Sequence, residues 1–496
     1  MSLEPLRARI DEIDASLLRL FQERMDVSAQ IAAQKRRDGL PVYDAARERA
    51  KAKAFHDAAR PPYGPYAQEL YASLCALSRR YQRCLGTPLR AGLLGRTLQH
   101  SFSPLIHSFF GDYSYDLFEV EPQQLESFVL SGPFDALNVT IPYKKAVLPY
   151  CGKLTARAQK AGNVNTLVRL KDGTLLGDNT DGVGFEAMVN SLPCQPAGKK
   201  VLVLGNGGAS ATVCSVLRAM GASEIAVIPH HGGERPENHR DAQWIVNATP
   251  CGMYPASDDA PISLDGFPTV EAVLDLIYNP ARTRLLLQAQ ARSIVHANGL
   301  TMLVMQAYAA AERFLGRDLP IRLAEEALRA VRRSQENIVL VGMPGCGKTT
   351  VGRLLAQKTG RAFFDADELL CERLGMDLPQ YLHTHPEAAF RDAEAGVLAA
   401  VGKRSGIVLA TGGGCVLRAQ NIASLKQNGR VIFLERALEK LPTQGRPLSQ
   451  AGDLGRMYRR RLPLYLAFAD ARAANDGTLQ EAVDNVLEAY DEVVDY

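Results

Sequence analysis

The spacing of apolar residues divides the chain into stretches with different secondary structure. From Leu6 to Ile31 the apolar residues recur in steps of three and four, which predicts one long amphipathic helix. Further helices are predicted to begin at Pro41 and at Tyr66, so the first stretch is expected to be all-helical. Beyond residue 90, short apolar runs typical of strands alternate with helical patterns, which indicates α/β folds.

Length and charge limit the possible organisation and partners. The chain has 496 residues, which is too long for one hydrophobic core and suggests about three domains. Lysine and arginine number 57 and aspartate and glutamate 54, so the formal charge of +3 predicts neither a nucleic-acid partner nor a membrane surface. No apolar run is long enough to span a bilayer, and the first residues lack the apolar core of a signal peptide. Since the nine cysteines contain no C-x-x-C pair, we expect reduced thiols and a cytoplasmic location.

A glycine-rich loop at residues 342–350 carries the clearest chemistry in the sequence. It reads G-M-P-G-C-G-K-T-T, follows the apolar run Ile338–Val341 and precedes a helical pattern. In this strand–loop–helix context G-x-x-x-x-G-K-[ST] binds nucleotide phosphates through backbone N–H groups, and an ordinary glycine turn is the weaker interpretation. Lys348 is expected to reach the outer phosphates and Thr349 to bind Mg²⁺. The residues predicted to bind ATP here are Gly342, Gly345, Cys346, Gly347, Lys348, Thr349 and Thr350.

Charged residues interrupt or flank the long apolar stripe of the first stretch. Arg24 stands where the stripe requires an apolar residue, and the stripe alone fits a solvent-reaching arginine as well as a ligand-binding one. The other polar residues that flank the stripe or lie on the next two helices are Arg7, Lys35, Arg47, Glu48, Ser78 and Gln82. Several cations around a helical pocket suit a small dianion, because arginine binds carboxylates in a bidentate geometry.

The order of these residues resembles that of the all-helical chorismate mutases over residues 1–86. The motifs that carry the resemblance are L-R-x-x-I from Leu6, E-R ending at Arg24, Lys35, P-V-x-D ending at Asp44, R-E from Arg47, Ser78 and Gln82. The resemblance implies that chorismate is bound by Arg7, Arg24, Asp44, Arg47, Glu48 and Ser78. It also implies that Lys35 and Gln82 hydrogen-bond the ether oxygen during rearrangement to prephenate, with no covalent step. In that family the first helices of two chains pair and each site borrows its Arg7 from the other subunit, so a homodimer is expected.

Polar residues at predicted strand ends mark the second stretch. Ser101 and Ser103 precede a helix and are equally well explained as capping residues, and Lys144 and Asp181 are compatible with a surface ion pair. The glycine-rich turn G-N-G-G-A at 205–209 follows a strand-like run and opens a helix. This arrangement is typical of dinucleotide binding, although on its own it is a weak signal.

The order of motifs in this stretch resembles shikimate dehydrogenase over residues 88–330. The motifs are H-S-x-S-P, N-V-T-x-P-x-K, G-x-V-N-T, G-D-N-T-D-G, N-A-T-P-x-G-M, Y-N-P and N-G-L. The resemblance implies a substrate lobe at about 88–190 plus 300–330 and a Rossmann-like cofactor lobe at about 191–299. It implies that shikimate is bound by Ser101, Ser103, Asn138, Thr140, Asn165, Tyr278 and Gln306. By the same resemblance Lys144 and Asp181 are the catalytic pair, and NADP is bound by Gly205, Asn206, Gly207, Gly208 and Ala209.

Two departures leave the cofactor and the activity of this module open. Where NADP-dependent members have Asn-Arg-Thr, the strand Ile225–Ile228 is followed by Pro-His-His, and an NAD-type acidic residue is equally absent. The segment from His230 to Gln243 is also shorter than the helix and strand that the family has there. Arg235 and the two histidines are the candidates for binding the 2′-phosphate. The alternative hypothesis is a non-catalytic shikimate sensor attached to an active mutase and kinase.

The third stretch continues from the phosphate loop through motifs at strand and helix ends. They are D-x-D ending at Asp367, F-R-x-x-E around Arg391, G-G-G at 412–414, R-P-L from Arg446 and R-x-P-L-Y from Arg461. The three glycines alone fit a flexible loop, but after a buried strand they more often let a ligand approach the backbone.

This order of motifs resembles shikimate kinase over residues 335–496, an α/β P-loop fold with a parallel sheet. The resemblance implies that Asp367 hydrogen-bonds the shikimate hydroxyl that attacks ATP, and that Arg391 and Arg461 bind the shikimate carboxylate. Gly413 and Gly414 are then expected to pack on the shikimate ring. Arg446 is expected to lie in a mobile lid at 438–455 that closes over the phosphates.

Taken together, the motifs predict a multidomain, trifunctional enzyme of the shikimate pathway of aromatic amino-acid biosynthesis. The expected substrates are chorismate, 3-dehydroshikimate and shikimate, and the expected cofactors are NADP, ATP and Mg²⁺. We expect a homodimer through the mutase module and no nucleic-acid or membrane partner. The dehydrogenase would produce the substrate of the kinase, whereas the mutase would act further along the same route.

Overall fold

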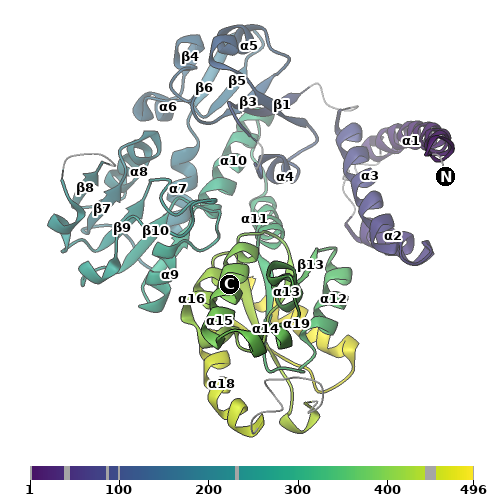
Figure 1. Ribbon diagram of the computed structural model, residues 1–496. Helices are drawn as coiled ribbons and strands as arrows, with labels where there is room; N and C mark the ends of the chain where they lie inside the picture. The colour runs from purple at the N-terminus through teal and green to yellow at the C-terminus, as the bar shows by residue number, and fades with distance from the viewer. Residues whose placement is uncertain are drawn as a thin grey trace. The chain divides into compact units, whose positions relative to one another are not determined.

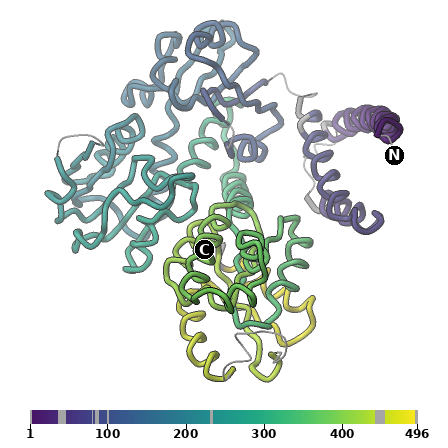
Figure 2. The backbone as a smooth tube through the Cα atoms, viewed as in Figure 1, coloured from purple at the N-terminus to yellow at the C-terminus, as the bar shows by residue number. Residues whose placement is uncertain are grey.

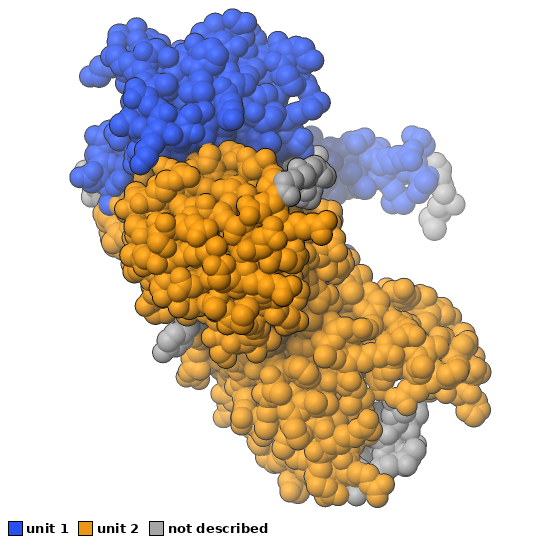
Figure 3. All heavy atoms as spheres, turned by 90° about the vertical axis from the view of Figure 1, so that its left-hand side faces the viewer, with its two compact units in different colours: residues 1–179, 310–319 blue, residues 180–309, 320–496 orange. Residues whose placement is uncertain are grey.

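The computed structural model describes residues 3–37, 45–84, 89–98, 101–229, 234–441 and 454–494. The chain divides into two compact units (Figure 3). Unit 1 comprises residues 1–179 and 310–319, and unit 2 comprises residues 180–309 and 320–496. Within the described ranges, no helix is both long enough and apolar enough to cross a membrane.

Unit 1 begins with three helices, which confirms the all-helical fold predicted for the first stretch. They are α1 (Glu4–Arg37), α2 (Ala45–Ala58) and α3 (Gly64–Cys84). Helix α3 packs against both α1 and α2, and α1 is unbroken over its whole length (Figure 2). The apolar stripe of α1 is largely exposed in the single chain, since Leu6 is 61% and Leu17 is 53% exposed. The three helices therefore leave an extended apolar surface uncovered.

The rest of unit 1 is built on a six-stranded sheet with the strand order β2-β1-β3-β5-β6-β4. The strands are β1 (Arg90–Gly95), β2 (Ser114–Glu119), β3 (Ala136–Val139), β4 (Lys153–Leu154), β5 (Thr166–Arg169) and β6 (Leu175–Asp178). Strand β1 runs parallel to β2 and β3, whereas β5 runs antiparallel to β3 and β6. Leu94, Leu137 and Leu167 fill the core of this sheet, and the helices beside it are α4 (Ser103–His107), α5 (Leu125–Ser131) and α6 (Ala156–Ala161).

Unit 2 begins with a fully parallel five-stranded sheet with the order β11-β10-β9-β7-β8. The strands are β7 (Lys200–Leu204), β8 (Glu224–Ile228), β9 (Trp244–Asn247), β10 (Ala272–Asp275) and β11 (Val295–Asn298). The helices of this part are α7 (Asp181–Asn190), α8 (Gly208–Ala219), α9 (Arg284–Ala291) and the first turns of α10 (Leu300–Leu315). In the described part of the connection from β8 to β9 there is only a short 3-10 turn, Pro236–His239, and β8 is an edge strand. The short His230–Gln243 segment predicts a cofactor lobe that lacks a helix and a strand here, and the described residues of this connection contain neither.

A second parallel sheet follows in unit 2, with the order β13-β14-β12-β15-β16. Its strands are β12 (Asn337–Val341), β13 (Phe363–Asp365), β14 (Val408–Ala410), β15 (Gly429–Glu435) and β16 (Ala471–Ala474). The helices that surround it are α12 (Lys348–Thr359), α13 (Ala366–Leu374), α14 (Leu378–Thr384), α15 (Glu387–Gly402), α16 (Ala419–Lys426), α18 (Leu454–Phe468) and α19 (Leu479–Val494) (Figure 1). The predicted fold class is confirmed for both α/β parts.

The two sheets of unit 2 are joined by a buried segment. Helix α11 (Arg322–Gln335) runs almost directly into β12, and Gln335, Glu336 and Asn337 are all buried. Glu336 forms a bidentate ion pair with Arg430, at 2.9 and 2.8 Å. The polar residues at 335–337 are therefore packed in the interior, which their polar side chains in the sequence do not indicate.

Candidate active sites

The glycine-rich loop of unit 2 lies between β12 and α12, where the backbone is shaped for phosphate. Gly347 occupies the position before α12 with a φ of 96°, a left-handed conformation that favours glycine. The Asn475 amide donates to the carbonyl of Cys346 at 2.6 Å. Asn475 directly follows the edge strand β16, so a residue from the edge of the sheet holds the loop in place. The first N–H groups of α12 thus lie beside the loop, and N–H groups at a helix N-terminus attract anions.

Lys348 and two acidic residues lie beside this loop. The Lys348 ammonium is buried and donates to the carbonyls of Gly342 and Met343, at 3.0 Å each. The Thr349 hydroxyl donates to Asp365 at 2.7 Å, and the other Asp365 oxygen accepts from the backbone N–H of Asp367 at 2.9 Å. Asp365 therefore connects the loop to the first turn of α13, which carries Asp367.

Two buried arginines lie at the other end of the same region. Arg391 on α15 donates to Glu394 at 2.9 Å, and burial raises the pKa of Glu394 although the guanidinium opposes this shift. Arg461 on α18 donates to the carbonyl of Gly413 at 3.0 Å. A Cβ added at Gly414 would overlap the Arg391 guanidinium, so a glycine is required there for Arg391 to keep its position.

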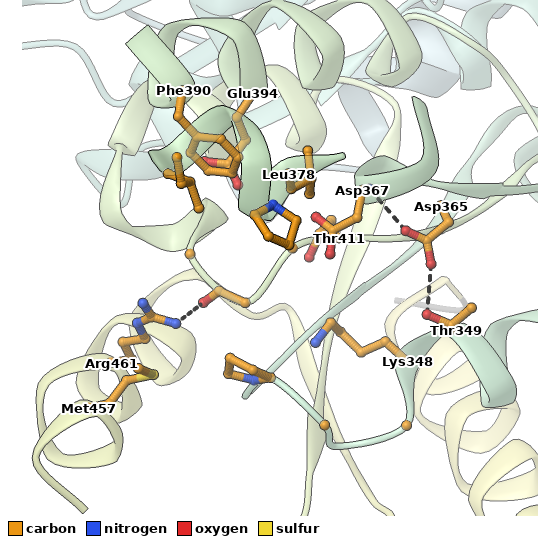
Figure 4. A pocket seen from close by; sticks show the side chains of 18 of the residues that line it. Lys348, Thr349, Asp365, Asp367, Leu378, Phe390, Glu394, Thr411, Met457 and Arg461 are labelled. Carbon is orange, nitrogen blue, oxygen red and sulfur yellow. Dashed lines mark hydrogen bonds between the residues drawn. The ribbon is translucent and has the colours of Figure 1, made fainter. Parts of the chain in front are cut away.

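These groups surround one cavity of about 480 Å³. The side chains of Lys348, Asp367 and Arg461 point toward it from three different elements (Figure 4). The predicted kinase residues that line the cavity are Gly345, Gly347, Lys348, Thr349, Thr350, Asp367, Arg391, Gly413, Gly414 and Arg461. Gly342 and Cys346 are not among its lining residues, and Cys346 is fully buried in the sheet core. The predicted lid residue Arg446 lies outside the described residues.

In unit 1, the predicted shikimate-binding residues lie near the carboxyl ends of β1 and β3 and directly before the start of β5. Asn138 at the end of β3 accepts a hydrogen bond from Tyr115 at 2.8 Å, which orients its amide. Asn165 is buried and accepts from the Thr166 hydroxyl at 2.9 Å. The Ser101 hydroxyl accepts from the backbone N–H of Ser103 at 3.2 Å. The backbone N–H of Thr140 donates to Leu94 at 2.9 Å, and Lys144 is half-buried in the turn that follows β3.

A buried carboxylate, Asp178, supports these strand ends. It binds Arg157 at 2.7 Å, Arg313 at 2.9 Å and the Thr155 hydroxyl at 2.5 Å. Burial would raise the pKa of Asp178, but Arg157 and Thr155 outweigh burial and lower it. Asp178 is therefore ionised and holds Arg157, Arg313 and Thr155 together. The amide of the adjacent Asn179 donates to the Asn163 side chain at 2.7 Å.

In unit 2, the first parallel sheet presents its loops at a topological switch point. The sheet order places β7 between β8 and β9. The chain runs from β7 to β8 on one side and then crosses back to β9 on the other side of β7. The predicted cofactor residues, 205–209, follow β7 at this point, and Gly205 has a φ of 104°. A Cβ added at Gly207 or Gly208 would meet no atom within 4 Å, which leaves room for a ligand against the backbone.

The three remaining predicted dehydrogenase residues lie on different elements of unit 2. Asp181 is the first residue of α7 and is buried, in a position where a helix N-terminus stabilises a carboxylate. Tyr278 follows β10 and is half-buried, and burial raises its pKa. Gln306 lies on α10, and its side chain donates to the carbonyl of Leu303 at 2.9 Å. Helix α7 approaches α10 closely because Gly184 lies against the backbone of Met302 and Gln306.

In the helical module, the structure brings together only part of the predicted set. The Arg24 guanidinium donates to the Ser78 hydroxyl and, at 3.2 Å, to the carbonyl of Leu74. Gln82 lies one turn beyond Ser78 and is buried, and its Oε1 has no hydrogen-bond partner within the described part of the chain. Lys35 is half-buried and Arg47 is exposed, while Arg7 lies in the first turns of α1 and is largely exposed. Asp44 lies outside the described residues.

Several residues that belong to these sites were not predicted. Arg79 forms an ion pair with the predicted residue Glu48. The position of Arg79 directly after Ser78 is the feature of the sequence from which it could have been predicted. Asp365, Glu394, Thr411 and Arg436 line the cavity of the second sheet. Asp365 and Glu394 are in motifs that identified their neighbours, whereas Arg436 has no such signal because only the fold brings it to the loop.

The chain matches three family models in the order of its modules. Residues 6–83 match chorismate mutase type II, residues 93–167 match the shikimate dehydrogenase substrate binding domain, and residues 344–491 match shikimate kinase. These are an isomerase, an oxidoreductase and a kinase family.

Similar proteins cover about half of the chain. A protein of Methanopyrus kandleri named shikimate dehydrogenase (NADP(+)) is 37% identical over 273 residues, which are 48% of this chain and 93% of that protein. One of the same name from Oleidesulfovibrio alaskensis is 40% identical over 261 residues, covering 47% of this chain and 92% of the relative. A crystal structure of a chorismate mutase/shikimate 5-dehydrogenase fusion protein from Clostridium acetobutylicum is 31% identical and covers 49% of this chain and 97% of that chain, with a TM-score of 0.46. The chain belongs to the shikimate dehydrogenase family, with a chorismate mutase type II module before the dehydrogenase and a shikimate kinase module after it.

Proposed function

We propose that the chain is a trifunctional enzyme. Its mutase module would rearrange chorismate to prephenate, its dehydrogenase module would interconvert 3-dehydroshikimate and shikimate with NADP, and its kinase module would phosphorylate shikimate with ATP and Mg²⁺. The observation that carries the proposal is the cavity of the second parallel sheet, because a phosphate-binding loop and two buried arginines line the same space. The module boundaries at 1–86, 88–330 and 335–496 are part of this proposal.

In the kinase module, the cavity has an end for phosphate and an end for a carboxylate. The loop N–H groups and Lys348 would bind the phosphates, and Arg391 and Arg461 would bind the shikimate carboxylate. Asp367 also lines the cavity and would position the attacking hydroxyl. The chemistry then needs little more than alignment and neutralisation of phosphate charge.

Two kinase residues fit a magnesium site. The Thr349 hydroxyl and the Asp365 carboxylate are 2.7 Å apart beside the loop, and both provide the oxygen ligands that Mg²⁺ prefers. Among the described residues no group of three or more His, Cys, Asp or Glu side chains is arranged to hold a metal ion. Mg²⁺ would therefore complete its coordination with phosphate oxygens and water, as is usual for this ion.

The first prediction concerns the glycine that lies against Arg391. A Gly414→Ala chain is expected to raise the KM for shikimate about tenfold or more, because a Cβ would displace the Arg391 guanidinium, while the KM for ATP changes little. Steady-state kinase kinetics with each substrate varied in turn measures this split. Gly266→Ala is the matched control, since a Cβ there would meet no atom within 4 Å. A Gly414→Ala chain with the wild-type KM for shikimate would contradict the carboxylate site.

In the dehydrogenase module, Lys144 and Asp181 would exchange the substrate proton and orient the reacting hydroxyl. The proposal that these two residues serve one reaction rests on the family resemblance. NADP, when bound, would accept or supply the hydride, and the loop at 205–209 would hold its pyrophosphate against the start of α8. The relatives from M. kandleri and O. alaskensis are named for NADP(+), which supports this cofactor. Arg235 is exposed and is the candidate for the 2′-phosphate within the described residues after β8.

The second prediction separates an enzyme from a sensor. The wild-type chain is expected to oxidise shikimate faster with NADP than with NAD, and Lys144→Ala and Asp181→Ala are each expected to reduce kcat at least about 10²-fold, as for lost acid–base groups. Lys145→Ala is the control, because Lys145 is the exposed neighbour of Lys144. If the wild-type chain oxidises shikimate with neither cofactor, although an Arg461→Ala chain with a weakened kinase site still binds shikimate by calorimetry, the non-catalytic sensor is the better explanation.

In the mutase module, the geometry of α1 favours a shared site. Arg7 and Lys35 are 28 residues apart on one unbroken helix, which corresponds to about 42 Å along its axis. One chain therefore cannot bring both residues to one small ligand. A second copy that covers the exposed stripe with its own α1 would supply the missing arginine and bury Leu6, Ile10 and Leu17.

The third prediction tests this homodimer. Arg7→Ala and Lys35→Ala chains are each expected to be nearly inactive as mutases, because every site lacks one of the two residues. A refolded mixture is expected to regain activity, since a mixed dimer has one site with both residues and one with neither. Mixed dimers can be counted by native mass spectrometry. The shared site is wrong if mixed dimers form and activity does not return.

A further inference from the structure

The loop that follows β10 docks onto the kinase module within unit 2. The backbone N–H of Ala281 donates to the Asn428 side chain at 2.9 Å, and that of Arg282 donates to the carbonyl of Gln427 at 2.8 Å. Gln427 in turn donates to the carbonyl of Ser257 at 2.6 Å and accepts from its hydroxyl at 3.1 Å. Backbone groups of both modules therefore take part in the hydrogen bonds of this contact. A flexible linker between domains would not form such bonds.

Arg282 is the centre of this contact. Its guanidinium donates to the carbonyl of Lys426 at 2.7 Å and to the carbonyl of Gly429, and it lies 3.4 Å from a carboxylate oxygen of Asp470. Arg282 is only 8% exposed. Asp470 is also buried, and it accepts from Lys426 and from the backbone N–H of Val431, at 3.1 and 2.8 Å. Removing the guanidinium would take this donor from two carbonyls and would remove one of the two cations beside the buried Asp470 carboxylate.

The docked loop also carries Tyr278, one of the predicted shikimate-binding residues. The Tyr278 carbonyl accepts a hydrogen bond from Gln335, the last residue of α11 before the kinase sheet. On the opposite side, Thr283 donates to Asp275 at 2.7 Å and Asn298 donates to the carbonyl of Ala281 at 2.7 Å. Bonds from both modules therefore clamp the loop.

The contact continues to the nucleotide loop through the kinase sheet. Gly429, which receives the Arg282 guanidinium, is the first residue of β15, and β15 pairs with β12 from Asn337 to Val341. The phosphate loop begins directly after β12. A short, fully buried strand therefore separates the Arg282 contact from the predicted ATP site.

We propose that the kinase module is a structural part of the dehydrogenase cofactor lobe, joined through Arg282, so that the two unfold as one cooperative unit. A nucleotide bound at the phosphate loop then stabilises the cofactor lobe as well as the kinase. The stabilisation by nucleotide rests on the ATP site of the proposed function. The cooperative unfolding of the two modules does not depend on that site.

Trp244 provides a selective probe for the test. It is the only tryptophan in the chain, is 0% exposed and lies on β9 of the cofactor lobe. Urea unfolding of the full chain followed by Trp244 fluorescence reports the cofactor lobe, and amide exchange in the β12 and β15 peptides reports the kinase sheet. In the wild-type chain the two transitions are expected to coincide, and MgADP at about 100 times its Kd is expected to raise the Trp244 midpoint.

The Arg282→Met chain is expected to separate the two transitions, with Trp244 unfolding at lower urea and no longer responding to MgADP. Calorimetric titration of MgADP into this chain establishes that the phosphate loop is intact. Lys403→Met is the matched control, since the Lys403–Asp258 pair at 2.8 Å crosses the same contact at its exposed rim, and both transitions are expected to stay together.

Three results would overturn the proposal. The first is separate Trp244 and β12 transitions in the wild-type chain. The second is an unchanged urea midpoint of Trp244 fluorescence in the wild-type chain although MgADP binds. The third is that MgADP shifts this midpoint equally in a Lys348→Ala chain, because ADP would then act by binding at the dinucleotide site. If MgADP does not bind the wild-type chain at all, the proposed kinase function fails, and the coincidence of the two transitions still decides the structural proposal.

Discussion

Parallel strand pairing is the constraint on which both α/β parts of unit 2 depend. Because the strands of each sheet run in one direction, the loops that follow them emerge at one edge. The turn at 205–209 follows β7 at a switch point, and the phosphate loop follows β12 in the middle of its sheet. Each loop opens a helix, so backbone N–H groups and a helix N-terminus are available at both edges for phosphate groups. Side chains from distant helices, such as Arg391 and Arg461, then complete the kinase cavity.

The kinase cavity and the proposed mutase site differ in how much of each one a single chain contains. The kinase cavity lies entirely within unit 2, and its lining includes both the phosphate loop and the arginines. The helical module contains the Arg24–Ser78 contact and the buried Gln82, but its Arg7 is about 42 Å along α1 from Lys35. Under the proposed function, a single chain would therefore contain the whole kinase site but only part of the mutase site, and pairing of the first helices of two chains would complete the latter.

Local patterns predicted the elements and the loops well. The 3-4 spacing from Leu6 to Ile31 predicted α1, and the apolar run before the glycines predicted β12. Residues at fixed offsets within one motif, such as Lys348 and Thr349, could be assigned to one site because a strand–loop–helix unit is local. The sequence also indicated that the cofactor lobe is trimmed, since a segment of that length has no room for a further helix and strand.

Contacts between distant residues could not be predicted in this way. Nothing in the sequence pairs Arg282 with Asp470 or Glu48 with Arg79, because each pair depends on how separate elements pack. The residues at 335–337 are polar in the sequence and buried in the structure, since the side chain of Glu336 binds Arg430 and that of Gln335 binds the Tyr278 loop. Buried polar residues at module joints are thus invisible to hydrophobic periodicity, which assigns them to the surface.

The central claim is that the dehydrogenase and kinase modules of one chain catalyse consecutive reactions. A direct measurement supplies the purified chain with 3-dehydroshikimate, NADPH and MgATP and follows NADPH, ADP and the phosphorylated product together. The account predicts that one ADP and one shikimate 3-phosphate form for each NADPH oxidised, and that a Lys348→Ala chain oxidises NADPH at the wild-type rate but stops at shikimate. NADPH oxidation without phosphorylated product in the wild-type chain, or ADP formation only when shikimate is added from outside, would contradict it.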